Sequence, residues 1–181
     1  SQRFKWEASQ QVYKDLDDFV DHVIAIERQI IAELVNAGCK YIQIDAPGYT
    51  AYVDKVSLER MRSRGEDPER NFQRSIDADN ALIEGFPGVT FGIHICRGNA
   101  RTIDPQTGKL VPQWHREGSY DAIAEKLFNR LKHQRLLLEY DSDRAGGFEP
   151  LRLGPKDKVV VLGLVSTKNS DMETVDALKR R

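Results

Sequence analysis

The segment VTFGIHIC, from Val89 to Cys96, decides the fold because it is a nearly continuous apolar run with the length of one strand. Comparable runs lie at 41–45, 136–139 and 159–165. Runs of this kind that alternate with helical segments are typical of parallel strands with helices outside the sheet, and nearly continuous apolar strands are expected where both faces of the sheet are buried. The sequence therefore predicts an α/β fold with parallel strands.

Helical segments are expected between these runs. Apolar residues recur at helical spacing over 16–35, and further helices are expected around 72–84 and over 119–131, the last of them capped by its first residue, a serine. Ser170 and Glu173 have the spacing of a capping box. They predict a final helix with three apolar residues: Met172, Val175 and Leu178.

Two architectures fit this order of elements, an open doubly wound sheet and part of a (β/α)8 TIM barrel. A complete barrel takes about 250 residues, whereas this chain has 181. Neither a linker nor an internal repeat divides the sequence, so residues 1–181 are expected to form a single domain, about half a barrel. A fragment of a longer protein is the preferred explanation, and the pairing of two half-barrels, as a homo-oligomer or with a complementing half, is an alternative.

The composition narrows the classes of partner. The formal net charge is −1 and the pI is near 6.4, without a basic run, which argues against nucleic acid and acidic membranes. No stretch approaches the roughly 18 consecutive apolar residues of a membrane span, and residues 1–12 lack the apolar run of a signal peptide. The two cysteines are too few for a disulfide framework. We therefore expect a cytoplasmic protein.

Residues able to do chemistry follow the predicted strands, where parallel α/β folds build their sites. They are Asp45 at the end of the first strand, His94 and Cys96 at the end of the second, Glu139 at the end of the third and Lys168 after the fourth. The period of a strand is two residues, so His94 and Cys96 should point to one side with Ile95 turned away. Imidazole, thiolate and carboxylate are zinc ligands. A purely structural His and Cys is the alternative, and Glu139 disfavours it because a carboxylate directly after three leucines needs a cation or a partner.

Further polar residues surround this predicted zinc site. Arg97 and Asn99 follow the ligand pair in a loop that contains glycine, and they are candidates for binding an anionic group of a substrate, while a loop turn stabilised by Asn99 is the alternative. Asp141, Asp143 and Arg144 are expected either to form an ion-pair network that orients Glu139 or to be solvated charges. The long loop 99–118, which contains His115, is a candidate lid or simply an exposed loop.

Four of these motifs together resemble the C-terminal half of the cobalamin-independent methionine synthase barrel. They are, in chain order, YIQIDAP (41–47), GIHICRGN (92–99), LEYD (138–141) and VLGLV (161–165). The residues of the second and third motifs are most similar to those of short single-barrel relatives of that synthase. These relatives include methyltransferase-like proteins and the epoxyalkane:coenzyme M transferases. The resemblance covers residues 13–181.

The resemblance implies a zinc-dependent enzyme that transfers a methyl or alkyl group from a small-molecule donor to a small-molecule thiol. By it, His94, Cys96 and Glu139 match three zinc ligands, and Asp45 matches an acid that contacts the amino group of the thiol substrate. Lys168 stands where the synthase has a histidine proposed as proton donor, so Lys168 is expected to donate a proton or to bind an anionic group. Zinc keeps a bound thiol in its nucleophilic thiolate form near neutral pH.

The resemblance leaves alternatives open. The family's fourth ligand is a cysteine on a segment beyond the final helix, and Cys39 is expected to be a small residue at the other end of the barrel. Two hypotheses compete with a zinc enzyme. One is a decarboxylase-type barrel without zinc, in which Asp45 and Arg97 handle carboxylates. The other is a truncated family member without activity.

Overall fold

The four predicted apolar runs form one parallel sheet. The computed structural model describes residues 6–98, 101–112, 116–168 and 172–181. Within them the strand order is β1-β2-β5-β6, and each neighbouring pair is parallel. The bounds are β1 (Tyr41–Asp45), β2 (Thr90–Ile95), β5 (Arg135–Glu139) and β6 (Val159–Gly163). The mixed α/β class and the parallel sheet are thus confirmed, and the sheet is consistent with part of a TIM barrel.

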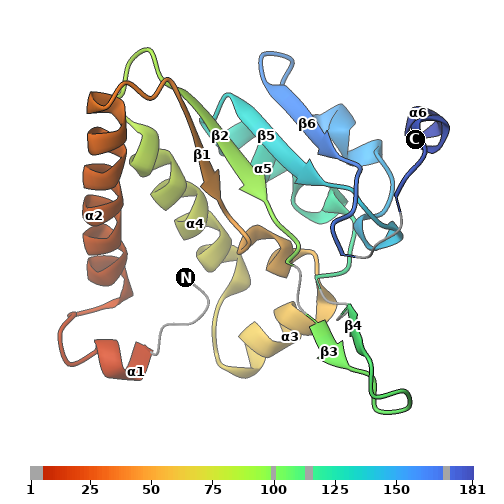
Figure 1. Cartoon of the computed structure of the whole chain (residues 1–181). Coiled ribbons are helices and arrows are strands. Elements are labelled where there is room, and N and C mark those ends of the chain that lie inside the picture. The colour runs from red at the N-terminus through yellow and green to blue at the C-terminus, as the bar shows by residue number, and fades with distance from the viewer. Residues whose placement is uncertain (1–5, 99–100, 113–115, 169–171) are drawn as a thin grey trace.

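The main helices lie on one face of the sheet (Figure 1). They are α2 (Leu16–Asn36), α4 (Pro68–Ile83) and α5 (Ala124–Arg130). Asp15 caps α2 by accepting from the Asp18 N–H at 2.9 Å, and Asp67 caps α4, whose first residue is a proline with no N–H to satisfy. The first two helices are close to the predicted ranges.

Alternate residues of the strands pack beneath these helices. Ile93, Ile95, Leu136 and Leu138 are at most 1% exposed. They form one apolar cluster with residues of α4 and α5, such as Phe72, Ile76, Leu127 and Phe128. Burying one such aliphatic side chain contributes roughly 1.5–3 kcal/mol, so this face supplies much of the stability.

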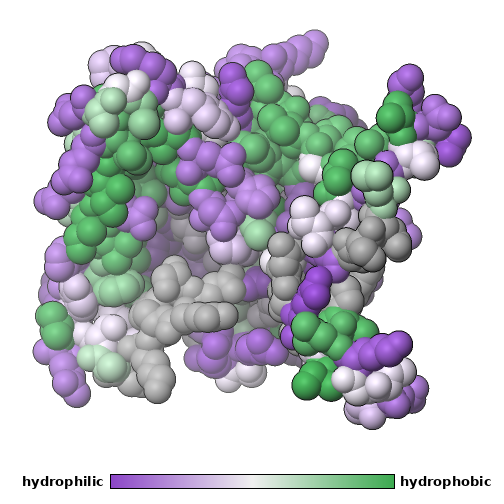
Figure 2. Space-filling view, viewed as in Figure 1, coloured by the Kyte–Doolittle hydropathy of each residue, from purple (hydrophilic) through white to green (hydrophobic). Residues whose placement is uncertain are grey.

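The opposite face of the sheet is open in the described part of the chain. Tyr41 is 44% exposed on β1, while Val159 and Val161 are 53% and 39% exposed on β6. Figure 2 shows hydrophobic side chains at the surface over β6. The apolar runs predicted that both faces of the sheet are buried, whereas within the described residues helices cover one face and the other is open.

The third and final helices differ from their predicted extents. Over 119–131 the chain forms a 3-10 helix, η2 (Tyr120–Ala122), and then α5, and the Tyr120 hydroxyl donates to the Ile95 carbonyl at 3.3 Å. The final helix α6 (Val175–Arg180) is capped by Thr174. The Glu173 carboxylate instead accepts from the Ser166 N–H at 2.8 Å, and Ser170 lies outside the described residues.

Several short elements were not predicted from the sequence. Part of the candidate lid loop forms a hairpin of β3 and β4, which projects from the body of the molecule in Figure 1. The bounds are α1 (Trp6–Ser9), η1 (Tyr49–Tyr52), α3 (Lys55–Ser63), β3 (Arg101–Ile103), β4 (Leu110–Pro112), η3 (Asp143–Ala145) and η4 (Glu149–Leu153). None of the helices in the described ranges has the length and apolar character that a bilayer span requires.

Candidate functional site

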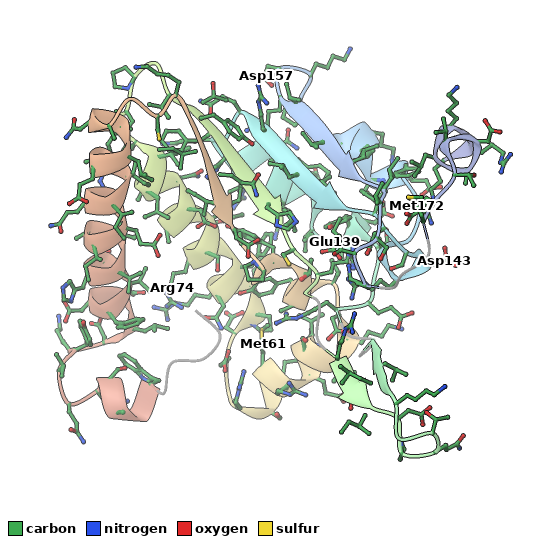
Figure 3. All side chains as sticks on the ribbon, viewed as in Figure 1. Met61, Arg74, Glu139, Asp143, Asp157 and Met172 are labelled. Carbon is green, nitrogen blue, oxygen red and sulfur yellow. The ribbon has the colours of Figure 1, made fainter. Side chains whose placement is uncertain are left out.

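The sheet brings the predicted site residues to one edge. In the register of the strands, Asp45 pairs with His94, and Glu139 pairs with Gly163 of β6. The alternation expected along β2 is confirmed, since Ile95 is fully buried in the core while the side chain of His94 is 31% exposed on the open face. Figure 3 shows Glu139 at the carboxyl end of β5, far from Asp157, which precedes β6 at the other end of the sheet.

Three donor groups converge at this edge. One ligand atom each of Asp45, His94 and Cys96 lie within 4.8 Å of one another. Oxygen, nitrogen and sulfur atoms of these three residue types are all donors that zinc binds. The Asp45 Oδ1 lies 2.7 Å from the His94 Nδ1. This contact engages Nδ1 of the imidazole, and in many zinc sites the other ring nitrogen is the one that binds the metal.

The Cys96 thiol lies in a half-buried environment with carboxylates nearby. Burial raises its pKa, and the charges of Glu139 and Asp45 add to the effect, whereas the Gly98 N–H, 3.1 Å from Sγ, opposes it. A thiol of raised pKa stays protonated near neutral pH unless a cation stabilises the thiolate.

His94, Cys96 and Glu139 line the same pocket of about 300 Å³. The carboxylate of Glu139, however, is already engaged by protein groups. Its Oε2 accepts from the Arg97 N–H at 2.6 Å, and its Oε1 accepts from Arg144 at 2.6 Å and from the ammonium group of Lys168. The structure thus groups two of the three predicted ligands with Asp45, which the sequence had suggested only as a substrate contact, and leaves Glu139 on the adjoining wall.

An ion-pair network surrounds Glu139. Of the three residues that the sequence suggested for it, Asp141 and Arg144 belong to the network formed by the described residues and Asp143 does not. Asp141 and Arg144 are buried, and Lys168 contacts both Glu139 and Asp141. Although burial alone would raise the pKa of Asp141, Lys168 and the Ser166 hydroxyl hold it below its usual range. Asp143 is exposed and lies toward the periphery (Figure 3). The expected role of Lys168 as a proton donor or anion-binding group stays a prediction.

The structure places Arg97 in the core instead of the pocket. It is fully buried, its guanidinium donates to the carbonyls of Arg116 at 2.6 Å and Gly118 at 2.9 Å, and it lies 4.4 Å from the centre of the Tyr120 ring. These contacts indicate that Arg97 holds the loop that precedes η2. Its position directly after His94 and Cys96 in the sequence did not indicate this role. Asn99 and His115 lie outside the described residues.

The fold and the site define a class: an α/β protein with a parallel sheet like part of a TIM barrel and a His-Cys-carboxylate cluster at the carboxyl edge of its strands. No protein-family model matches the chain. Two uncharacterized proteins of Bacillus subtilis are similar to it: YxjH is 32% identical over 182 residues and YxjG is 34% identical over 181 residues. In both cases the match covers 98% of this chain and 45% of the relative, so the chain spans less than half the length of these proteins.

A solved structure is also similar. It is a protein from Listeria monocytogenes that is provisionally described as a vitamin-B12-independent methionine synthase. The TM-score is 0.66 and the sequence identity is 26%, with 93% of this chain and 43% of that chain covered. The resemblance inferred from the sequence motifs therefore has a structural counterpart, which supports a methionine synthase-like fold.

Proposed function

We propose that this chain carries the metal centre of a zinc-dependent enzyme that transfers a methyl or alkyl group to a thiol. The observation that carries the proposal is the convergence of the Asp45, His94 and Cys96 donor atoms within 4.8 Å, beside the Glu139 carboxylate in one pocket. The similarity to the Listeria protein supports the class of reaction. Because the chain spans less than half of its relatives, the activity belongs to a protein that includes the remaining elements.

Each residue has a distinct task in this proposal. His94 would bind zinc through Nε2 while Asp45 orients the ring through Nδ1, and Cys96 would bind as thiolate with Glu139 as the third ligand. Zinc, when bound, lowers the pKa of a substrate thiol so that its thiolate attacks an electrophilic carbon at neutral pH. The carbon–sulfur bond forms as the bond to the leaving group breaks, and the electron pair stays with the leaving group.

We also propose that the sheet is half of a closed barrel. In the described residues, β1 and β6 each have one strand neighbour, and the face between them is open. Further strands of a complementing half, on the same polypeptide or on another, would pair with both edges and enclose the pocket between the two halves.

The test is the zinc content of the longest natural form of the protein, purified without chelators and measured by elemental mass spectrometry. The expected result is about one zinc per chain, lost in a Cys96→Ser variant. Cys39→Ser is the matched control, because Cys39 is also a free cysteine of intermediate burial but packs against an apolar cluster apart from the pocket. Full zinc content in Cys96→Ser, or none in the wild-type protein, would refute the proposal.

A further inference from the structure

Glu139 is close to the donor cluster by topology but is not part of it. It follows Leu138, which pairs with Ile95, so it lies alongside Cys96 and lines the same pocket. Nevertheless the compact donor set found in the described residues consists of Asp45, His94 and Cys96. Some feature of the protein must hold the Glu139 carboxylate away from that set.

Among the described residues three groups hold Glu139, and one of them is suited to release it. The Arg97 donor is a backbone N–H, and the Arg144 side chain is 3% exposed and fixed by neighbouring contacts, including one to the Gly98 carbonyl at 3.3 Å. Lys168, by contrast, lies in the segment after β6, is 15% exposed, and reaches the pocket with a flexible stem. Its ammonium group also contacts Asp141, so it has a second partner if Glu139 is withdrawn.

The charges in this part of the pocket are already balanced. Glu139 and Asp141 are paired with Arg144 and Lys168, two carboxylates with two cations. A divalent cation bound by His94 and Cys96 would attract Glu139 and repel the neighbouring ammonium group. Both effects favour an exchange in which Glu139 turns toward the metal and Lys168 keeps Asp141.

We propose that Lys168 is a resident cation of the site: it pairs with Glu139 and Asp141, competes with zinc for the Glu139 carboxylate, and thereby sets the zinc affinity. The inference rests on the proposed function, because it takes the His94-Cys96 pocket to be a zinc site. It assigns Lys168 a positioning role that acts through Glu139 and does not require contact with substrate.

The experiment is a zinc affinity measurement by competition with a chromophoric chelator, in the longest natural form of the protein. Lys168→Met removes the charge and keeps the length of the stem, so zinc should bind more tightly by on the order of tenfold or more. Lys168→Arg keeps a cation and should stay near the wild-type affinity. Lys40→Met, an exposed lysine directly before β1 at the other end of the sheet, controls for the loss of one positive charge.

A second readout separates competition from a general change in charge. Without zinc, Lys168→Met should melt below the wild-type protein because Glu139 and Asp141 lose their shared cation, and zinc should raise its melting temperature by more. Equal or weaker zinc binding by Lys168→Met would overturn the inference while leaving a zinc enzyme intact. If neither protein binds zinc, the inference and the proposed function both fail.

Discussion

The two faces of the same sheet use neighbouring residues for opposite purposes. Along β2, Ile95 is fully buried under the helices, whereas Cys96, one residue later, contributes to the pocket on the open face. Along β5, Leu138 and Glu139 repeat this step. Mutations on the helix-covered face should therefore affect mainly stability, and mutations on the open face mainly metal binding. The exception is a charged residue of the open face that is itself buried.

The largest effect is expected at that exception. Glu139→Ala should lower the free energy of unfolding by about 3–5 kcal/mol, because among the described residues the buried Arg144 keeps only Asp141, 4.0 Å away, as a carboxylate partner. It should also abolish zinc binding. Chemical denaturation and zinc titration measure the two losses, and Glu139→Gln, which keeps shape and hydrogen-bonding capacity, should cost less stability. If the unfolding curve of Glu139→Ala matched that of the wild-type protein, the Glu139 carboxylate would contribute no more to stability than an exposed residue.

Ile95→Ala should lower stability while leaving zinc binding nearly unchanged. It creates a cavity in the apolar cluster and should cost about 2–5 kcal/mol of stability. Zinc affinity, measured at a temperature where the variant is folded, should stay within about twofold of wild type, since the side chain points away from the pocket. A large loss of affinity would mean that the two faces are mechanically coupled.

His133 makes the buried part of the molecule sensitive to acid. It is fully buried with no hydrogen-bond partner on either ring nitrogen among the described residues. Burial, with the nearby Lys158, lowers its pKa from its usual 6.5 to about 4. The unfolded chain therefore binds the proton more readily, so stability is lost as the pH falls from about 6.5 toward 4, by up to about 3 kcal/mol. His133→Leu should remove this part of the pH dependence in denaturation curves at pH 7 and pH 5, whereas an unchanged slope would exclude His133 as its source.

The smallest effect is expected from Asp45→Asn. The Asp45 side chain is 59% exposed, so stability should hardly change. Its contact with Nδ1 of His94 orients the imidazole, and weakening it should reduce zinc affinity by about 10- to 100-fold. Isothermal titration with zinc gives the value. A complete loss of binding would instead identify Asp45 as a direct ligand.

The elements that follow from local periodicity were predictable from the sequence. The period of two along β2 predicted that His94 and Cys96 share a side, and the parallel sheet predicted that Asp45 and Glu139 end at the same edge. The helices over 16–35 and 72–84 were predictable for the same reason, because their apolar spacing is local information.

The features that depend on tertiary contacts were not predictable. The break between η2 and α5 lies beside the buried Tyr120, whose hydroxyl contacts the Ile95 carbonyl, and the apolar spacing of 119–131 does not indicate it. Arg97 has the chemistry of an anion-binding residue, and only the packing of the Tyr120 ring and the loop carbonyls against it reveals its burial. The contact between Asp45 and His94 likewise needs the register of two strands that are far apart in sequence.

The exposed strand β6 has a consequence for handling the protein. Val159–Gly163 is an apolar segment with one free backbone edge in the described structure, and it carries no proline or charged residue that would block pairing. Such an edge is a template for strands of other molecules. Material that lacks a complementary strand along this edge should therefore self-associate as its concentration rises, and a lysine in place of Val161 should keep it dispersed.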